Sequence, residues 1–326
     1  MNILVTGGAG YVGSIVSEQL LKQGHEVFVL DNLTQGHHAA VPDDAVFLYF
    51  DIDEVAALED ILVHCRIDAV MHMAAETVVE FSMTDPGRYF KTNIVDGITL
   101  LDTMVKSKVN RIIFSSSASV YGEPESPLIG EDHPKNPINS YGETKLMFEN
   151  ILKWYGSAYG LKHISLRYFN AAGASENLGE DHWPETHLIP NILKAAMNPD
   201  KPVAVFGTDY PTRDGSCVRD YVHVIDIARA HILALEKLDE LSGRAYNLGS
   251  GEGYSVLEVI DIASEVTGVN IPIDMHPRRA GDPAVLVASS VRAGAELGWN
   301  PEHTTLREII ESAWKWMKEN PDGYEC

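Results

Sequence analysis

The sequence predicts an α/β fold, with a doubly wound parallel sheet followed by a second, smaller α/β domain. Short β-branched runs alternate with amphipathic segments of helix length through the first half of the 326-residue chain. A glycine-rich turn follows the first of these runs, and prolines interrupt the alternation after about residue 170. Strand then helix, repeated, gives parallel strands that helices cover on both faces.

The expected elements follow one another in order along the chain. Strands are predicted over residues 3–5, 26–31, 46–50, 69–71, 111–114 and 164–166, and helices over 14–23, 54–63, 93–107 and 141–159. Later helices are predicted over 226–237, 255–267 and 305–318, with a strand over 245–248. We expect residues 1–170 to form the nucleotide-binding domain and residues 171–326 the substrate domain, with segments around 220–250 returning to the first.

Composition and charge narrow the class of protein. The chain has 47 acidic and 25 basic residues, a formal net charge of −22, which disfavours nucleic acid and anionic membranes as partners. No apolar run approaches the roughly 20 residues that span a bilayer, and no secretory signal pattern opens the chain. Cys65, Cys217 and Cys326 form no C-x-x-C pair, and His37-His38 lack a helical partner with a carboxylate. We therefore expect a cytoplasmic protein without disulfides and without a metal site.

The glycine-rich turn predicts a nucleotide site. Gly7, Gly10 and Gly13 stand between the first strand and the first helix, a spacing that permits a tight turn, close approach of a diphosphate and close helix packing. The helix N-terminus would offer free N–H groups to that diphosphate. Asp31 ends the second strand 18 residues after Gly13, where a carboxylate favours NAD over NADP in a Rossmann fold. Asp51 is expected either to hold the adenine or to cap the helix near Val55.

Tyr141 and Lys145 are candidates for proton transfer. They lie four residues apart at a predicted helix start and so share one face. Lowering a tyrosine pKa by about 3 units requires about 4 kcal/mol, which a nearby lysine and an oxidised nicotinamide together would supply. A hydroxyl of the serine run at the end of the fifth strand, within residues 115–119, could relay the proton. Taken alone, each feature also fits a surface pair or an ordinary loop.

Together these motifs resemble the nucleotide-sugar epimerases of the extended short-chain dehydrogenase/reductase family, over nearly the whole chain. The matching segments are TGGAGYVG from Thr6, FSSSASVYG from Phe114, SYGETK from Ser140, RYFN from Arg167, DYPTRDG from Asp209, VRDYVHV from Val218 and RRAGD from Arg278. The resemblance implies NAD-dependent interconversion of UDP-galactose and UDP-glucose through a 4-keto sugar, by a cytoplasmic homodimer that binds neither nucleic acid nor membrane.

The resemblance also assigns roles to matching positions. It implies catalysis by Tyr141, Lys145 and Ser117. The implied cofactor-binding residues are Gly7, Gly10, Tyr11, Val12, Gly13, Asp31, Asn32, Asp51, Ile52, Ala74, Asn93, Ser115, Tyr141, Lys145 and Tyr168. The implied substrate-binding residues are Ser117, Tyr141, Asn170, His187, Leu188, Phe206, Arg219, Arg279 and Asp282.

Departures from the family pattern keep alternatives open. Thr77 replaces a lysine of some relatives, and His187 replaces an asparagine. Leu286 stands where a tyrosine restricts other members, so UDP-N-acetyl sugars are a second candidate substrate. A dehydratase would need an Asp-Glu pair where Ala118 and Ser119 stand, and a non-catalytic NAD sensor would not need the tyrosine and lysine.

Overall fold

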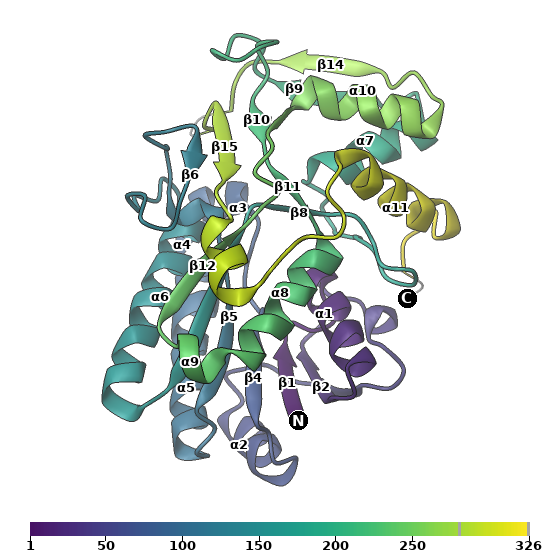
Figure 1. Cartoon of the computed structure of the whole chain (residues 1–326). Helices are drawn as coiled ribbons and strands as arrows, with labels where there is room; N and C mark the ends of the chain where they lie inside the picture. Colours follow the sequence, from purple (N-terminus) through teal and green to yellow (C-terminus); the bar gives the residue numbers. More distant parts are fainter. Residues whose placement is uncertain (280–281, 325–326) are drawn as a thin grey trace.

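The computed structural model describes residues 1–279 and 282–324 and confirms the predicted α/β class (Figure 1). A seven-stranded parallel sheet has the strand order β12-β7-β5-β4-β1-β2-β3. In chain order its strands are β1 (Asn2–Thr6), β2 (Glu26–Asp31), β3 (Val46–Tyr49), β4 (Ala69–His72), β5 (Arg111–Ser117), β7 (Lys162–Tyr168) and β12 (Arg244–Leu248). The order reverses between β1 and β4, so a crevice opens at the carboxyl ends of these central strands.

Helices cover both faces of the sheet because alternate strand residues point to opposite sides. Ile3 and Val5 pack in one buried cluster with α1 (Tyr11–Lys22) and α8 (Val224–Glu236). Leu4, between them, packs on the other face, where the helices are α2 (Val55–His64), α5 (Gly97–Lys106) and α6 (Ser140–Tyr159). The apolar runs in the sequence are thus the strands of a sheet buried on both faces.

The expected helix over residues 93–107 is less regular than predicted. The short helices α3 (Val79–Thr84) and α4 (Pro86–Phe90) precede it. A π-helical segment over Lys91–Asp96 then leads into α5. Its wider turn is of a kind that often occurs near functional sites, and Thr92 and Asp96 from this segment line the cleft described below.

The smaller lobe combines helices with short strands around its own apolar core. Its elements are β8 (Asn170–Ala172), α7 (Leu188–Met197), β9 (Val203–Phe206), β10 (Val218–Arg219), β11 (Tyr221–His223), β13 (Tyr254–Ser255), α10 (Val256–Thr267), β14 (Ile273–His276), β15 (Val285–Ala288) and α11 (Leu306–Glu319). β6 (Leu128–Ile129), from the earlier part of the chain, pairs with β15. Figure 1 shows α7, α10 and α11 gathered at one end of the molecule, beyond the carboxyl ends of the large sheet.

Two later segments belong to the large sheet layer. β12 pairs with β7, and α8 packs against α1. The short helix α9 (Leu238–Leu241) connects α8 to β12. A division of the chain into domains at residue 170 remains our proposal, with these segments assigned to the first domain.

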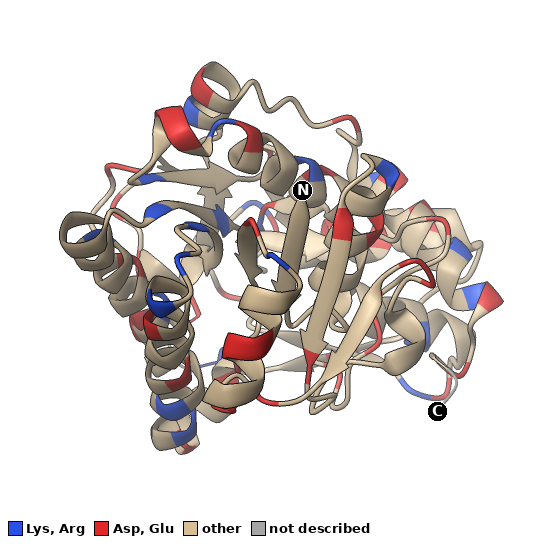
Figure 2. Ribbon diagram, turned by 90° about the horizontal axis from the view of Figure 1, so that it is seen from below, with Lys and Arg blue, Asp and Glu red and all other residues tan. Residues whose placement is uncertain are grey.

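Charged residues are distributed over both lobes. In Figure 2 the acidic residues occur on helices and loops throughout the view and are interspersed with lysines and arginines. The formal net charge of −22 is therefore spread over the ribbon and not concentrated in one segment. In the part of the chain that the structure describes, no helix has the length and apolar character needed to cross a bilayer.

Candidate active site

A cleft of about 1300 Å³ runs along the carboxyl edge of the large sheet and continues beside the smaller lobe. It brings together residues that are up to 315 positions apart in the chain, from Gly7 to Asp322. All the predicted site residues line it except Asn93 and Ser115. Thr77 and Leu286, the two departures at the nicotinamide and sugar positions, line it as well.

The glycine turn forms one end of the cleft. Gly7 has a φ of +71°, and a Cβ atom there would lie 2.6 Å from the Ala74 backbone nitrogen. A Cβ on Gly13 would lie 2.1 Å from the Gly7 carbonyl oxygen. Gly10 is the N-cap of α1 and makes no side-chain cap hydrogen bond, so the first N–H groups of the helix have no capping side chain. This cradle fits a diphosphate, which needs backbone donors and no side chain in the way.

Two carboxylates follow the glycine turn along the cleft. Asp31 accepts hydrogen bonds from the Ala9 and Leu33 backbone nitrogens, at 3.0 and 2.8 Å. Burial raises the pKa of Asp31, while these two bonds act to lower it. Asp51 accepts a hydrogen bond from Asn32 Nδ2 at 2.7 Å. The alternative of Asp51 as a helix cap is wrong: α2 begins at Val55 as expected, but its N-cap is Glu54.

Tyr141 and Lys145 share one face of α6, as predicted, and both line the cleft. Lys145 Nζ lies 5.7 Å from the centre of the Tyr141 ring and donates a hydrogen bond of 2.8 Å to the Ser115 carbonyl oxygen. Ser117, the last residue of β5, lines the cleft with them. The three candidate catalytic side chains therefore converge at the end of β5.

The protein alone does not lower the pKa of Tyr141, contrary to part of our expectation. Burial raises that pKa, and the hydrogen bond with Ser117 offsets only part of the increase. Burial also lowers the pKa of Lys145, to about 7, so the lysine is a weaker cation than expected. The low tyrosine pKa needed for a base at neutral pH must therefore come from a further positive charge beside the pair.

Asn93 and Ser115 do not line the cleft and contact the residues that form its wall, so a role of these two residues in holding the cofactor stays a prediction. The Asn93 side chain accepts a hydrogen bond from Glu76 N at 2.8 Å and donates one to Glu76 O at 3.1 Å. It also donates to Thr144 Oγ1 at 3.0 Å. Ser115 holds Lys145 through its carbonyl oxygen. Both residues are almost completely buried, and the Ser115 hydroxyl lies 3.2 Å from His231 Nε2.

The other end of the cleft carries the predicted arginines. Arg219 forms an ion pair with Asp282 and donates to the Val218 carbonyl oxygen at 2.8 Å. The Arg279 guanidinium stacks 3.9 Å above the centre of the Phe206 ring. Two guanidinium groups suit a second diphosphate, because their planar donors pair with phosphate oxygens in two places at once.

The remaining substrate positions line the same cleft. Asn170 donates to the Asp220 carbonyl oxygen at 2.8 Å, and Leu188 begins α7. Leu286 pairs in register with Arg219, on neighbouring strands. His187 reaches the cleft, but its Nδ1 lies 2.5 Å from Glu180 Oε1, so this histidine is engaged by a carboxylate. Burial acts to lower the pKa of His187, but Glu180 and Glu185 raise it to about 9.

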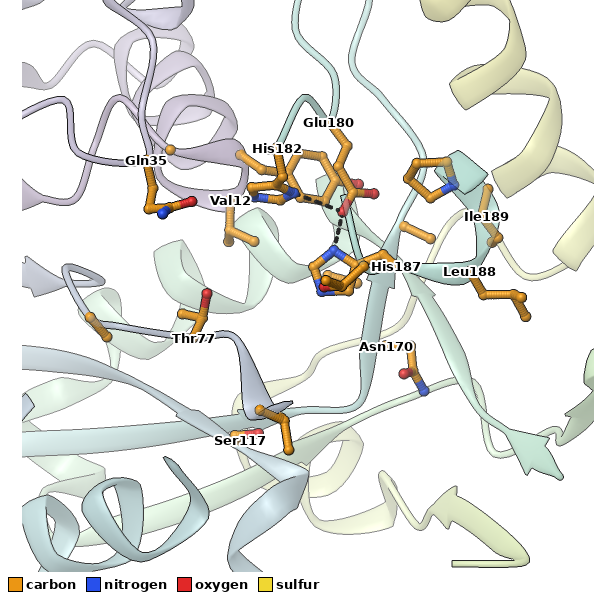
Figure 3. A pocket seen from close by; sticks show the side chains of 18 of the residues that line it. Val12, Gln35, Thr77, Ser117, Asn170, Glu180, His182, His187, Leu188 and Ile189 are labelled. Atoms are coloured by element: carbon orange, nitrogen blue, oxygen red, sulfur yellow. Dashed lines mark ion pairs between the residues drawn. The ribbon is translucent and has the colours of Figure 1, made fainter. Parts of the chain in front are cut away.

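Sequence reasoning missed Glu180 and His182, which also line the cleft beside His187 (Figure 3). In the figure, the Glu180 carboxylate lies between the two imidazole rings. The segment EDHWPETH from Glu180 has the spacing E-x-H-x-x-E-x-H. That pattern of potential ligands was the available signal, although it follows neither a helical nor a strand period.

The glycine cradle, the Asp31 carboxylate and the Tyr-Lys-Ser group on one doubly wound sheet define a nicotinamide-dependent enzyme of the extended short-chain dehydrogenase/reductase type. Comparison with known proteins narrows the class. The chain belongs to the NAD dependent epimerase/dehydratase family, whose model matches residues 3–249.

Relatives match the chain over nearly its whole length. It is 50% identical to the UDP-glucose 4-epimerase of Halalkalibacterium halodurans, over 99% of this chain and 98% of the relative. The UDP-glucose 4-epimerase of Brucella ovis, solved in complex with NAD, superposes with a TM-score of 0.93 at 44% identity, over 96% and 97% of the two chains. The UDP-glucose 4-epimerase of Bifidobacterium longum, solved in complex with NAD⁺ and UDP, superposes with a TM-score of 0.94 at 37% identity. The match covers 99% of this chain and 100% of that chain.

Proposed function

We propose that this protein is an NAD-dependent isomerase that interconverts UDP-galactose and UDP-glucose. The observation that carries the proposal is the continuous cleft, in which the Tyr141, Lys145 and Ser117 group lies between a glycine cradle and an arginine-bearing end. The first end suits a dinucleotide and the second a nucleoside diphosphate, so the sugar would lie between them, at the catalytic side chains. The names and ligands of the relatives support the same activity.

The cradle and its neighbours fit NAD. The backbone N–H groups at the start of α1 would hold the diphosphate, and Asp31 would accept the adenosine ribose hydroxyls and repel a 2′-phosphate. Lys145 would hold the nicotinamide ribose. When bound, NAD accepts a hydride from C4 of the sugar and returns it to the opposite face of the 4-keto sugar.

The protein's own part in the reaction is proton transfer and positioning. Tyr141 Oη takes the proton of the sugar 4-hydroxyl, with Ser117 hydrogen-bonded between the two oxygens, and later returns it. Because the positive nicotinamide would lie beside Tyr141, its charge would oppose the pKa increase that burial causes. Arg219 and Arg279 grip the diphosphate, while few charged groups surround the sugar. The sugar is then free to turn about its diphosphate link between the two hydride transfers.

An isotope experiment tests the chemistry. UDP-galactose deuterated at C4 is incubated with the purified protein in ordinary water, and the products are identified by mass spectrometry and NMR. We expect UDP-glucose that keeps the deuterium at C4, since the same hydride returns. A 4-keto-6-deoxy product would instead indicate the dehydratase alternative, and recovery of unchanged substrate would contradict the proposal.

UDP-N-acetylgalactosamine is a second candidate substrate because of Leu286. This side chain lines the cleft and is smaller than the tyrosine that restricts other members, which leaves room beside C2 of the sugar. Parallel assays with the acetylated and plain UDP-sugars distinguish a permissive site from a restricted one.

We further propose a cytoplasmic homodimer that associates through α5 and α6. Trp154 on α6 is 74% exposed and Tyr159 is 59% exposed, an apolar surface that a second copy would cover. Ile94 and Leu101 are buried in the core of the chain, so they would not contribute to that surface. Replacement of Trp154 by aspartate should shift the mass measured by light scattering from that of two chains toward one; a wild-type monomer would refute the dimer.

The cytoplasm is the compartment in keeping with the free Cys65 and Cys217 thiols.

A further inference from the structure

Four side chains from one loop converge on a single point at the wall of the cleft. They are Glu180, His182, Glu185 and His187, which we call the 180–187 cluster. Each offers one ligand atom, and all four atoms lie within 4.8 Å of one another. Figure 3 shows three of the four at the cleft, with Glu180 directed toward both histidines. The loop connects β8 to α7, and α7 begins at Leu188, directly after the last of the four.

Several polar atoms of the cluster are buried and, although they form ion pairs with one another, none of them makes a hydrogen bond of good geometry. They are Glu180 Oε1, His182 Nδ1 and Glu185 Oε2. The Glu180 and Glu185 side chains are only 7% and 5% exposed. Buried carboxylates are destabilising unless positive charge neutralises them, and here that charge comes from His182, His187 and Lys194 within 4.0 Å. These atoms face one another, so a single group placed among them would satisfy all of them.

The spacing of the ligand atoms fits a small cation. Zinc bonds to imidazole nitrogen and carboxylate oxygen are about 2.1 Å long, which puts neighbouring ligand atoms of a tetrahedral site about 3.4 Å apart. His182 Nδ1 lies 3.3 Å from Glu180 Oε1 and 3.9 Å from Glu185 Oε2. His187 Nδ1 lies 3.6 Å from Glu185 Oε1 and 2.5 Å from Glu180 Oε1. Three of the four separations are near the expected value, and the fourth requires a small shift of His187.

The surroundings also require positive charge. The His182 ring packs edge-on to Tyr11, the first residue of α1, with ring centres 6.2 Å apart. The cluster therefore adjoins the helix end that we assign to a diphosphate. The ion pairs with His187 and Lys194 reduce the repulsion that two carboxylates exert on an anion, and a divalent cation bound to both carboxylates and to two neutral imidazoles would remove it.

We propose that the 180–187 cluster binds one Zn²⁺ ion, which fixes the loop against the cleft. Two imidazoles and two carboxylates are ligands that zinc accepts readily, and a closed set of four protein ligands is typical of a structural site. The ion would join the loop into one unit at the start of α7, and so fix the position of Leu188. Its role is separate from the hydride and proton transfers, which the Tyr141 group performs.

Zinc titration tests the proposal. Untagged protein is treated with a chelator, dialysed and titrated with ZnCl₂ in a calorimeter. We expect one ion per chain, with imidazole nitrogen and carboxylate oxygen ligands and no sulfur in the zinc X-ray absorption spectrum. Zinc should also raise the unfolding temperature of the wild-type protein. The absorption spectrum excludes the cysteines as the source of binding and depends on no variant.

Variants locate the ion. His182→Ala and Glu185→Gln each remove a direct ligand, so the zinc affinity should fall by more than the 10- to 100-fold that loss of an outer partner costs. His64→Ala is the matched control, because His64 is an exposed histidine 2.8 Å from only one carboxylate, that of Asp60. It should bind zinc as the wild type does. Absence of stoichiometric zinc in the wild type, sulfur ligation, or equal binding by all variants would overturn the proposal.

Discussion

Replacement of Lys145 by methionine should stabilise the protein at neutral pH although it removes a candidate catalytic residue. Lys145 is almost completely buried, and its ammonium group is partly compensated by a hydrogen bond to the Ser115 carbonyl oxygen. Burial lowers its pKa from 10.5 to about 7. The unfolded chain therefore binds more protons than the folded chain between these two pH values, and its unfolding free energy rises with pH across that window.

The size of the effect follows from the pKa difference. Below pH 7 the full cost of burying the lysine, about 5 kcal/mol at 1.36 kcal/mol per pKa unit, opposes folding. As the pH rises to 9 the folded lysine is already neutral, and about 2 kcal/mol of that cost disappears. The cost vanishes as the pH passes the unfolded pKa. Methionine has a similar length and no charge, so Lys145→Met carries none of this dependence.

Urea unfolding of both chains, freed of nucleotide and followed by circular dichroism from pH 7 to 9, measures the difference. We expect the stability advantage of Lys145→Met to shrink by about 2 kcal/mol over this range. Other titrating groups cancel because both chains carry them. A difference that stays constant with pH would refute the conclusion that burial lowers the lysine pKa.

The remaining predictions concern catalysis, specificity and the core. Tyr141→Phe should lower the turnover rate by at least ~100-fold and leave the NAD content of the purified protein unchanged, because only the proton carrier is lost; near-normal turnover would remove Tyr141 from its role. Leu286→Tyr should suppress any conversion of UDP-N-acetylgalactosamine and spare that of UDP-galactose, as measured by chromatography, and equal loss on both would refute the gate. Arg167→Met should lower the urea unfolding free energy by about 3–5 kcal/mol, because it leaves the buried Glu149 carboxylate without its ion-pair partner. A loss below about 1 kcal/mol would show that Glu149 is protonated or solvated in the folded chain.

The large sheet was predictable because its strands are local apolar runs with a clear alternation. The predicted strand over residues 26–31 is β2 with the same bounds, and Asp31 ends it as expected. The irregular segment before α5 was not predictable, since its π-helical turn depends on packing against α4 and α6 and no proline or glycine marks it within Lys91–Asp96.

The candidate site was predictable where a motif lies within one turn, as for the glycines and for Tyr141 with Lys145. Its depth was not. The sequence alone does not distinguish Ala74, which lines the cleft, from Asn93, which contacts residues that form its wall. The 180–187 cluster was missed for a related reason. Its ligands converge only because an irregular loop folds back on itself, and no period of helix or strand describes that path.

Conversion of UDP-galactose to UDP-glucose by the purified protein, with no NAD added, tests the central claim most directly. The account predicts full conversion to equilibrium, since hydride leaves and returns within one cleft and the cofactor ends unchanged. Conversion that appears only after NAD is supplied would show that the cleft does not retain its cofactor. No UDP-glucose with or without NAD would contradict the account.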